Sequence, residues 1–294
     1  RWIVSAFNDA LGGDLEALDA LLEQDNVPAP VTLVARPTRA TSADLADLGA
    51  EPGRWSPLAA VMSSGDPGDF EAVRRGDIGV QDEGSQLVTL ALTSTPVDTH
   101  SAEEWLDLCA GPGGKAALLA GLADERGAHL VANELHEHRA NLIRQVLRHS
   151  IGDHTVVVGD GTSGEWASAT FDRVLVDAPC SGLGALRRRP EARWRRNAQD
   201  LAGLVKLQRQ LLTSALDVVK PGGAVAYVTC SPHLAETVLV VNDVVKKRED
   251  LTVLDAREQL PMVDELGPGP FVQLWPHLHG TDAMFLALIR RNAQ

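Results

Sequence analysis

From residue 105 onward, short apolar runs alternate with longer amphipathic stretches. Short apolar runs predict buried strands, and apolar residues spaced three and four apart predict helices that cover them. The predicted strands are Trp105–Leu108, His129–Ala132, Thr155–Val158, Arg173–Val176, Ala224–Val228, Leu251–Leu254, Phe271–Leu274 and Met284–Ile289. The predicted helices are Gly114–Ala123, His136–His149, Leu201–Val219 and Ala235–Lys247. This alternation predicts an α/β fold, a doubly wound and mostly parallel sheet with right-handed crossovers.

The first 75 residues have another pattern and predict a separate unit. Two helices are expected within Trp2–Leu22 and Asp14–Glu23, a strand at Val31–Ala35, and a short helix at Thr41–Leu48 capped by its first residues. Residues 49–70 are rich in Gly, Pro and Ser and predict a loop with one apolar piece, Pro57–Met62. We therefore expect a small α/β accessory domain at 1–75 and a larger domain at 76–294, in which Asp82 caps a helix through Ala91.

Composition is that of a globular protein, with 44% hydrophobic and 23% charged residues. No apolar run approaches the ~20 residues that span a bilayer, and the start at Arg1 lacks an initiator Met, so we expect a trimmed chain. Three widely spaced cysteines favour a reducing, cytoplasmic compartment over disulfides, and nothing in the pattern predicts a metal site. The net charge of −13 argues against a nucleic-acid partner unless a local basic patch exists.

A glycine-rich turn, Asp107-Leu-Cys-Ala-Gly-Pro-Gly-Gly-Lys115, follows the first strand of the larger domain. It lacks the spacing of phosphate loops and of dinucleotide binders, although its glycines let a ligand approach the backbone. Glu134 ends the next strand, where an acid can accept hydrogen bonds from ribose hydroxyls, and Asp160 and Gly161 end the third. These strand ends indicate a nucleoside ligand without a diphosphate, and S-adenosylmethionine is the leading candidate. The alternative is that the glycine-rich turn is only a tight structural bend.

Two further strand tips carry Asp177-Ala-Pro-Cys180 and Thr229-Cys230-Ser-Pro. Adjacent strands lie about 5 Å apart, so side chains at neighbouring tips can converge on one substrate. A lone cysteine is usually a small buried hydrophobe, which is the plainer interpretation of Cys109. Cys180 and Cys230 lie instead in Pro-containing turns at the sheet edge, and the pattern alone does not decide which of the two is a nucleophile.

These three motifs, in this order, resemble the NOL1/NOP2/Sun family of RNA cytosine carbon-5 methyltransferases, closest to the bacterial Sun (Fmu) branch that acts on ribosomal RNA. The resemblance covers residues 78–290, including Gln81-Asp-Glu-Gly-Ser-Gln and His279-Gly-Thr-Asp282. It implies a Rossmann-like class I S-adenosylmethionine-dependent methyltransferase, acting as a monomer on RNA, with a small accessory domain that can bind RNA.

The resemblance also implies residue roles. Cys230 is the nucleophile that adds to carbon 6 of cytosine, although a Pro-Cys dipeptide, as in DNA cytosine methyltransferases, nominates Cys180. Cys180 assists product release, Asp177 contacts ring nitrogen 3, and Lys115 reaches the cofactor or Asp177. We expect the helix starting near Ala235 to help lower the pKa of Cys230. The implied cofactor residues are Cys109, Ala110, Gly111, Pro112, Gly113, Gly114, Lys115, Glu134, Arg139, Asp160, Gly161 and Asp177.

Residues 186–196 carry a basic run directly after the Cys180 turn. Such a run is often only a solvated face, but arginines beside a target base suit phosphate contacts, and a tryptophan among them can stack. The predicted RNA-binding residues are Arg187, Arg188, Arg189, Arg193, Trp194, Arg195 and Arg196.

The chain departs from the family pattern in three places. Thr32-Leu-Val-Ala-Arg36 replaces the usual Thr-Leu-Arg-Val-Asn, and of the Glu-Asn-Glu that follows the second cysteine motif only Glu236 is present. The Sun branch also carries an upstream NusB-like RNA-binding domain, which we expect to have been removed from this chain. Two alternatives stay open: a transfer-RNA cytosine methyltransferase, and a weakly active RNA-binding ribosome assembly factor.

Overall fold

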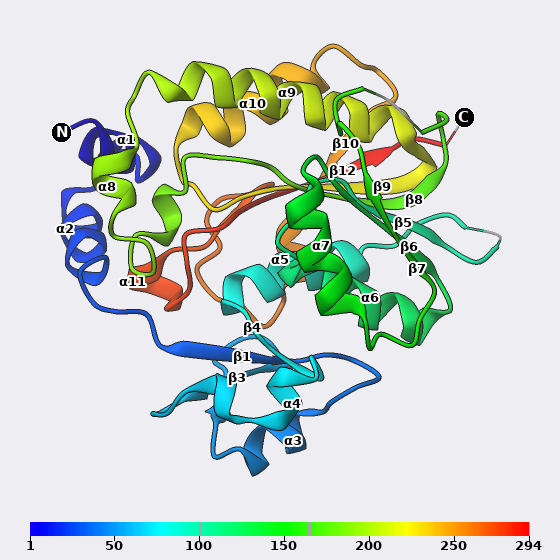
Figure 1. The fold of residues 1–294 in the computed structure, drawn as a ribbon. Coiled ribbons are helices and arrows are strands. Elements are labelled where there is room, and N and C mark those ends of the chain that lie inside the picture. The colour runs from blue at the N-terminus through cyan, green and yellow to red at the C-terminus, as the bar shows by residue number, and fades with distance from the viewer. Residues whose placement is uncertain (100, 164–165, 294) are drawn as a thin grey trace.

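Two sheets organise the protein, as Figure 1 shows for this computed structural model. The structure describes residues 1–99, 101–163 and 166–293. The larger sheet has the strand order β10-β12-β9-β8-β5-β6-β7, with β11 paired to β12. Its strands are β5 (Glu104–Asp107), β6 (His129–Glu134), β7 (His154–Val158), β8 (Phe171–Asp177), β9 (Val219–Thr229), β10 (Leu251–Leu254), β11 (Val272–Gln273) and β12 (Phe285–Arg291).

The direction of the strands in this sheet determines where the polar residues at their carboxyl ends lie. Strands β5, β6, β7, β8 and β9 are parallel, and β12 is antiparallel to β9. The chain runs outward from β5 through β6 to β7 and then returns to β8 on the other side of β5. Ligands bind at such a reversal of strand order, outside the carboxyl ends of the strands. The doubly wound sheet predicted from the sequence is therefore confirmed.

Helices cover both faces of the large sheet. One face packs against α5 (Glu83–Ser94), α6 (Gly114–Arg126) and α7 (Glu137–Leu147), and the other against α9 (Asp200–Val218) and α10 (Val238–Val245). Because side chains alternate along a strand, Trp105 of β5 joins the first core and its neighbour Leu106 joins the second. None of the helices within the described ranges is long and apolar enough to cross a membrane.

The smaller sheet has the antiparallel order β2-β3-β1-β4. It consists of β1 (Val31–Ala35), β2 (Glu51–Pro52), β3 (Ala59–Met62) and β4 (Ile78–Val80), together with α3 (Ser42–Asp47), η1 (Pro67–Asp69) and α4 (Glu71–Arg74). Thr41 caps α3 with a capping box, as the sequence pattern predicts. The apolar piece expected inside a loop is instead strand β3, because Val31–Val34 of β1 offers it a partner along its whole length.

The first two helices, α1 (Trp2–Ala10) and α2 (Leu15–Gln24), pack away from the small sheet. Phe7 and Leu21 share an apolar cluster with Leu183, Leu186 and Trp275 of the large domain. The division of the chain at residue 75 stays a proposal: the small sheet is completed by β4, and α1 and α2 lie beside α11 (Pro276–His279) and α8 (Ala192–Arg195) in Figure 1.

The predicted helix Ala235–Lys247 is wrong in its first part. A short 3-10 turn, η3 (Leu234–Glu236), comes first, and α10 begins only at Val238. Thr237 separates them with φ −118° and ψ −106°, outside the helical region. A second 3-10 turn, η2 (Leu183–Ala185), follows the Cys180 turn, and η4 (Ala256–Gln259) follows β10.

A single glycine lets the small domain approach α6 closely. A methyl group on Gly121 would lie 2.8 Å from the carbonyl oxygen of Pro37. We expect Gly121→Ala to lower the free energy of unfolding by roughly 1–3 kcal/mol, because a tightly packed contact becomes overpacked. Urea denaturation followed by circular dichroism measures the change.

Gly203→Ala is the matched control, since this α9 glycine has no neighbour within 4 Å of an added methyl group. There the higher helix propensity of Ala should raise stability by up to about 1 kcal/mol. Equal denaturation midpoints for the two variants would contradict close packing between Pro37 and α6.

Candidate active site

The two cysteine turns follow neighbouring strands. β8 and β9 are parallel and in register up to Asp177 opposite Val228, so the segments that follow them leave the sheet at the same edge. Cys180 and Cys230 meet there, with 3.4 Å between their sulfur atoms. Both thiols are free. The structure thus brings together the two cysteines that the sequence placed on separate tips.

Lys115 joins this group from the first turn of α6. Its Nζ atom donates to Oδ2 of Asp177 at 2.8 Å, and both side chains are largely shielded from solvent, at 11% and 29% exposure. Of the two contacts that the sequence left open for Lys115, the structure shows the one to Asp177. The ion pair places a cation and a carboxylate at the point where the strand order reverses, between β5 and β8.

The glycine-rich turn follows β5, the strand next to β8, at the same edge of the sheet. Residues 109–113 connect β5 to α6, and Gly114 is the first residue of that helix. Arg139 donates through Nη2 to the carbonyl oxygen of Gly111 at 2.5 Å, and its Nη1 lies 3.5 Å from Oε2 of Glu134. A Cβ atom on Gly111 would lie 2.1 Å from that same Oε2. A side chain at position 111 would therefore have to displace the Glu134 carboxylate, which packs directly against the backbone of the turn.

Asp107 provides a test of whether this edge of the sheet suits a polar ligand. Its side chain is fully buried, and neither carboxylate oxygen has a hydrogen-bond partner. Burial, reinforced by the nearby charge of Asp177, raises the pKa of Asp107 to about 8. The Oδ1 atom of neighbouring Asn133 also lacks a partner. Buried polar atoms normally find partners, so these orphaned groups fit a ligand with hydrogen-bond donors at the carboxyl end of β5.

Asp160 and Gly161 lie at the end of β7, beyond Glu134. Oδ1 of Asp160 accepts hydrogen bonds from the backbone nitrogen and the hydroxyl of Thr162, at 2.9 and 2.8 Å. These bonds lower the pKa of the exposed Asp160 carboxyl. Gly161 is buried against Leu108 and Leu211. The Glu134 carboxylate is also held locally, because its Oε1 accepts from the backbone nitrogen of His136 at 3.0 Å. The backbone nitrogen of Gly159, directly after β7, donates to the backbone carbonyl oxygen of Glu134 at 3.2 Å.

The basic run after Cys180 divides into an inner and an outer group. Arg188 donates to Asp82 at 2.9 Å and to Asp282 at 3.1 Å, and Arg187 is buried with its Nη2 on the carbonyl oxygen of Gly280 at 2.8 Å. Arg193 donates to the backbone of Asp25 at 2.8 Å.

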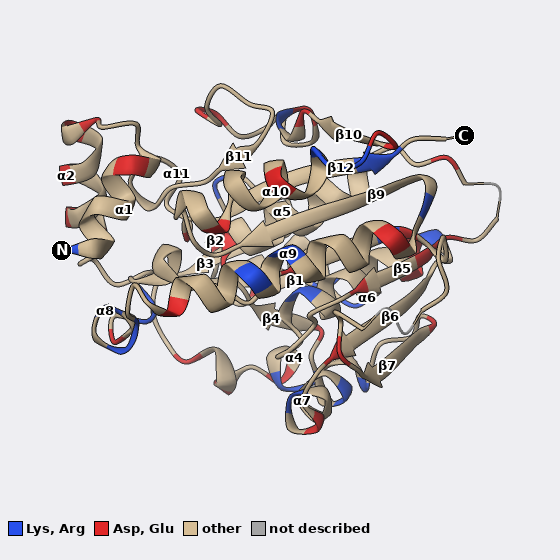
Figure 2. Ribbon diagram, turned by 90° about the horizontal axis from the view of Figure 1, so that it is seen from above, with Lys and Arg blue, Asp and Glu red and all other residues tan. Residues whose placement is uncertain are grey.

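The outer group has no such internal role. Trp194 is 77% exposed, and Arg189, Arg195 and Arg196 are exposed with it. Figure 2 shows the Lys and Arg positions of α8 in blue. Phosphate contacts are thus available to the outer group. RNA contacts by Arg187 and Arg188 stay a prediction, and they would require breaking the ion pairs of these arginines with Asp282 and Asp82.

The residues Cys230, Cys180, Asp177 and Lys115 form one cluster at the edge of the sheet, next to the buried carboxyl group of Asp107. A sequence model for the family described as "16S rRNA methyltransferase RsmB/F" matches residues 94–290, most of the larger domain. The chain belongs to this family. The resemblance to the NOL1/NOP2/Sun proteins inferred from the three motifs is therefore confirmed.

Relatives of known name agree with this membership. A Mycobacterium tuberculosis protein named as a methyltransferase is 53% identical over 293 residues, covering 99% of this chain and 63% of that protein. Ribosomal RNA small subunit methyltransferase B of Photorhabdus laumondii is 33% identical over 83% of this chain and 54% of its own length. Mouse 28S rRNA (cytosine-C(5))-methyltransferase is 30% identical over 94% of this chain and 37% of its own length. The chain thus spans less than two thirds of each of these proteins.

Solved structures share the fold. A methyltransferase homologue from Pyrococcus horikoshii has a TM-score of 0.77 and 24% identity, covering 95% of this chain and 91% of that one. NSun6 from the same organism, solved with the S-adenosylmethionine analogue SFG, has a TM-score of 0.81 and 15% identity, covering 99% and 98%. The predicted class, a Rossmann-like fold of S-adenosylmethionine-dependent methyltransferases, is confirmed.

The two neighbouring thiols of this family member are electrostatically unequal. A hydrogen bond from Cys180, with a further contribution from Lys115, lowers the pKa of Cys230 below its ordinary value against the opposing effect of burial. The same contact, together with burial, raises the pKa of Cys180 well above its ordinary value. Burial and Asp107 also raise the pKa of Cys109. The contact between the two sulfur atoms therefore shifts the pKa values of the two thiols in opposite directions.

The source of this effect differs from the expected one. The sequence predicts that a helix near Ala235 lowers the pKa of Cys230, but α10 begins only at Val238, eight residues after the cysteine. A helix terminus acts mainly within its first turn. The thiol of Cys180 and the ammonium of Lys115 supply the stabilisation instead.

Three residues near the site are not among the predicted site residues. Asp107 begins the glycine-rich motif as the last residue of β5. A charged residue directly after the apolar pair Trp105 and Leu106 is the sequence signal that could have marked it, and the structure shows that it is fully buried. Gln208 and Glu236 are both fully buried and bind the cysteine turns. Nothing in the local sequence pattern marks Gln208, since it is one polar residue on an amphipathic helix.

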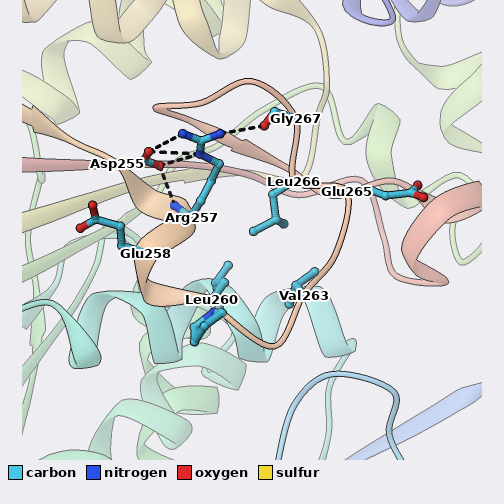
Figure 3. Close-up of a pocket in the computed structure, with 9 residues that line it drawn as sticks. Asp255, Arg257, Glu258, Leu260, Val263, Glu265, Leu266 and Gly267 are labelled. Atoms are coloured by element: carbon cyan, nitrogen blue, oxygen red, sulfur yellow. Dashed lines mark hydrogen bonds and ion pairs between the residues drawn. The ribbon is translucent and has the colours of Figure 1, made fainter.

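A separate cavity of about 520 Å³ lies in the segment after β10 and is lined by residues 255–267 (Figure 3). Its arginine, Arg257, is paired with Asp255 at 2.5 Å and donates to the carbonyl oxygen of Gly267 at 3.2 Å. None of the residues that line it belongs to the cysteine cluster. This cavity is therefore separate from the candidate active site.

The unequal thiols generate a prediction about reactivity. Iodoacetamide should label Cys230 before Cys180 and Cys109, with a midpoint pH below that of an ordinary thiol, because alkylation requires the thiolate. Peptide mass spectrometry across a pH series measures each site. Cys180→Ala should move the Cys230 midpoint to higher pH because it removes the hydrogen-bond donor. Labelling of Cys180 first would contradict the assigned direction.

Proposed function

We propose that the protein transfers a methyl group from S-adenosylmethionine to carbon 5 of a cytosine in RNA, by way of a covalent bond between Cys230 and carbon 6. The 3.4 Å contact between Cys180 and Cys230, beside the Lys115–Asp177 pair, carries this proposal. Membership of the RsmB/F family supports the RNA substrate.

Cys230 acts first. Its thiolate, favoured by Cys180 and Lys115, adds to carbon 6 and makes carbon 5 nucleophilic. Ring nitrogen 3 takes a proton relayed from the Lys115 ammonium through the carboxyl group of Asp177, which offsets the negative charge that develops during the addition. Lys115 also orients that carboxyl group. The base must leave its stack to reach these residues, since carbon 6 is covered within a helix.

S-adenosylmethionine supplies the electrophilic methyl group, and the residues placed to hold it are those of the glycine-rich turn together with Asp107, Glu134 and Asp160. After methylation the carbon-5 proton passes to a water molecule, and the electrons of that carbon–hydrogen bond restore the double bond between carbons 5 and 6 as the bond between carbon 6 and sulfur breaks. The proton on nitrogen 3 returns to the Lys115–Asp177 pair. Cys230 departs as a thiolate, which accepts a hydrogen bond from Cys180. Cys180 keeps its proton because its pKa is raised, so it stabilises the leaving group in this step.

We further propose that the substrate is small-subunit ribosomal RNA, in line with the names of several relatives. The free thiols, two of them 3.4 Å apart, suit the reducing cytoplasm where such RNA is made. Trp194, Arg189, Arg195 and Arg196 contact the RNA beside the target base. The monomeric state stays a prediction.

The cysteine roles are tested with purified variants, labelled S-adenosylmethionine and bacterial ribosomal RNA. Cys230→Ala should lower kcat by about 10³-fold or more, because the covalent route is lost. Cys180→Ala should accumulate a protein–RNA adduct, seen as a shifted band on a denaturing gel, because release is slowed. The Cys180→Ala/Cys230→Ala double variant is the control and should give no band. Near-normal turnover by Cys230→Ala would contradict the assignment of Cys230 as the nucleophile. Mapping the labelled base identifies the RNA substrate.

The outer arginines are tested by the salt dependence of RNA binding. Arg195→Gln/Arg196→Gln should flatten the slope of log Kd against log salt by about 0.7 for each single-strand phosphate that the variant no longer neutralises. Lys246→Gln/Lys247→Gln is the control and removes the same charge directly after α10. Because α10 leads from the cysteine edge of the sheet to the opposite edge, this double variant should leave the slope unchanged. An equal change of the slope in both double variants would mean that Arg195 and Arg196 do not contact RNA.

A further inference from the structure

Glu236 is a fully buried carboxylate between the two cysteine turns, six residues after Cys230. Its Oε1 accepts a hydrogen bond from the backbone nitrogen of Ser181 at 2.7 Å. Its Oε2 accepts from the hydroxyls of Ser181 and Ser231 at 2.5 and 2.7 Å. Ser181 directly follows Cys180, and Ser231 directly follows Cys230. One side chain therefore binds the residue after each cysteine.

Two further contacts hold this carboxylate in place. Gln208 of α9 donates from Nε2 to Oε1 of Glu236 at 3.1 Å and to the carbonyl oxygen of Pro179 at 2.9 Å, directly before Cys180. The hydroxyl of Tyr227, in β9, donates to the backbone carbonyl of Glu236 at 2.7 Å. The carboxylate is thus connected to α9, to β9 and to both turns.

The cost of burial indicates that this arrangement has a purpose. A carboxylate removed from water loses a large hydration free energy, which an ion pair usually offsets. The donors to Glu236 are uncharged: a backbone N–H, two hydroxyls and an amide. They fill the acceptor sites of both oxygens, and every one of these bonds holds a residue next to a cysteine or the glutamine that binds Pro179.

We propose that Glu236 is a positioning residue that sets the distance between the sulfur atoms of Cys180 and Cys230. The inference rests on the proposed function for its catalytic meaning, since Cys180 must stay within hydrogen-bond reach of Cys230 to favour the thiolate. Glu236 does not touch the reacting base in this scheme. Without it, the two turns lose their shared anchor and the sulfur atoms separate.

Diamide crosslinking measures this geometry independently of methylation. Diamide takes two hydrogens from neighbouring thiols, so the rate of disulfide formation between Cys180 and Cys230 depends on their proximity. In Glu236→Ala this rate and kcat should each fall about tenfold or more. In Glu236→Gln one carboxylate oxygen is replaced by an NH2 group, which cannot accept the two hydrogen bonds made to that oxygen, so the crosslinking rate and kcat should each fall about threefold. Cofactor affinity should stay within about twofold, because the glycine-rich turn and Glu134 make no contact with Glu236 among these hydrogen bonds.

Asp243→Asn is the matched control, a carboxylate on α10 whose partners are Arg209 and Lys246. It should leave the crosslinking rate and kcat unchanged. If Glu236→Ala does not fold, as judged by thermal unfolding, Glu236→Gln decides. A folded Glu236 variant that crosslinks as fast as the parent protein overturns the inference.

The two proposals fail in distinguishable ways. Loss of crosslinking in Glu236→Ala, in a protein that methylates no RNA, supports the positioning role and counts against the proposed function. Normal crosslinking in the folded variants, in a protein whose Cys230→Ala variant is inactive, counts against the positioning role alone.

Discussion

The parallel alignment of β5, β8 and β9 is the constraint on which the rest of the site depends. Parallel strands end at a common edge, and the reversal of strand order beside β5 leaves a crevice there. Asp107, Asp177 and Cys230 come from distant parts of the sequence, yet each stands at the end of one of these strands. The core on both faces of the sheet therefore acts as the scaffold that brings these groups together.

At that edge of the sheet the side chains are buried, so small differences in their contacts have large effects on their pKa values. Asp107 and Asp177 both lie near Lys115, but Asp177 holds the ion pair, and the pKa of Asp107 rises to about 8. The two thiols differ in the same way, since the one that accepts the hydrogen bond gains the anionic character. A low-dielectric site strengthens such contacts, so a shared network can hold neighbouring groups of one type in different protonation states.

The charge of the protein also has a local explanation. The protein has a net charge of −13, and an exposed basic run would be unusual on such an acidic protein. Only part of the run is exposed. Arg187 and Arg188 are instead partners of Asp282 and Asp82, and they fasten the segment after Cys180 to the start of α5 and to the turn before β12. Only the outer arginines are available for a partner, so the run serves both the fold and the surface.

The sequence by itself determined the order and type of the main elements and the motifs at the strand tips, because hydrophobic periodicity and turn residues are local properties. It indicated Glu134, Asp177, Cys180 and Cys230 for the same reason. The tertiary structure alone decided that α10 starts after the η3 turn, that Arg188 turns inward, and that Glu236 links the two cysteine turns. The Arg188–Asp82 and Ser181–Glu236 bonds join residues 106 and 55 positions apart. Side-chain hydrogen bonds of that kind leave no periodic pattern in the sequence.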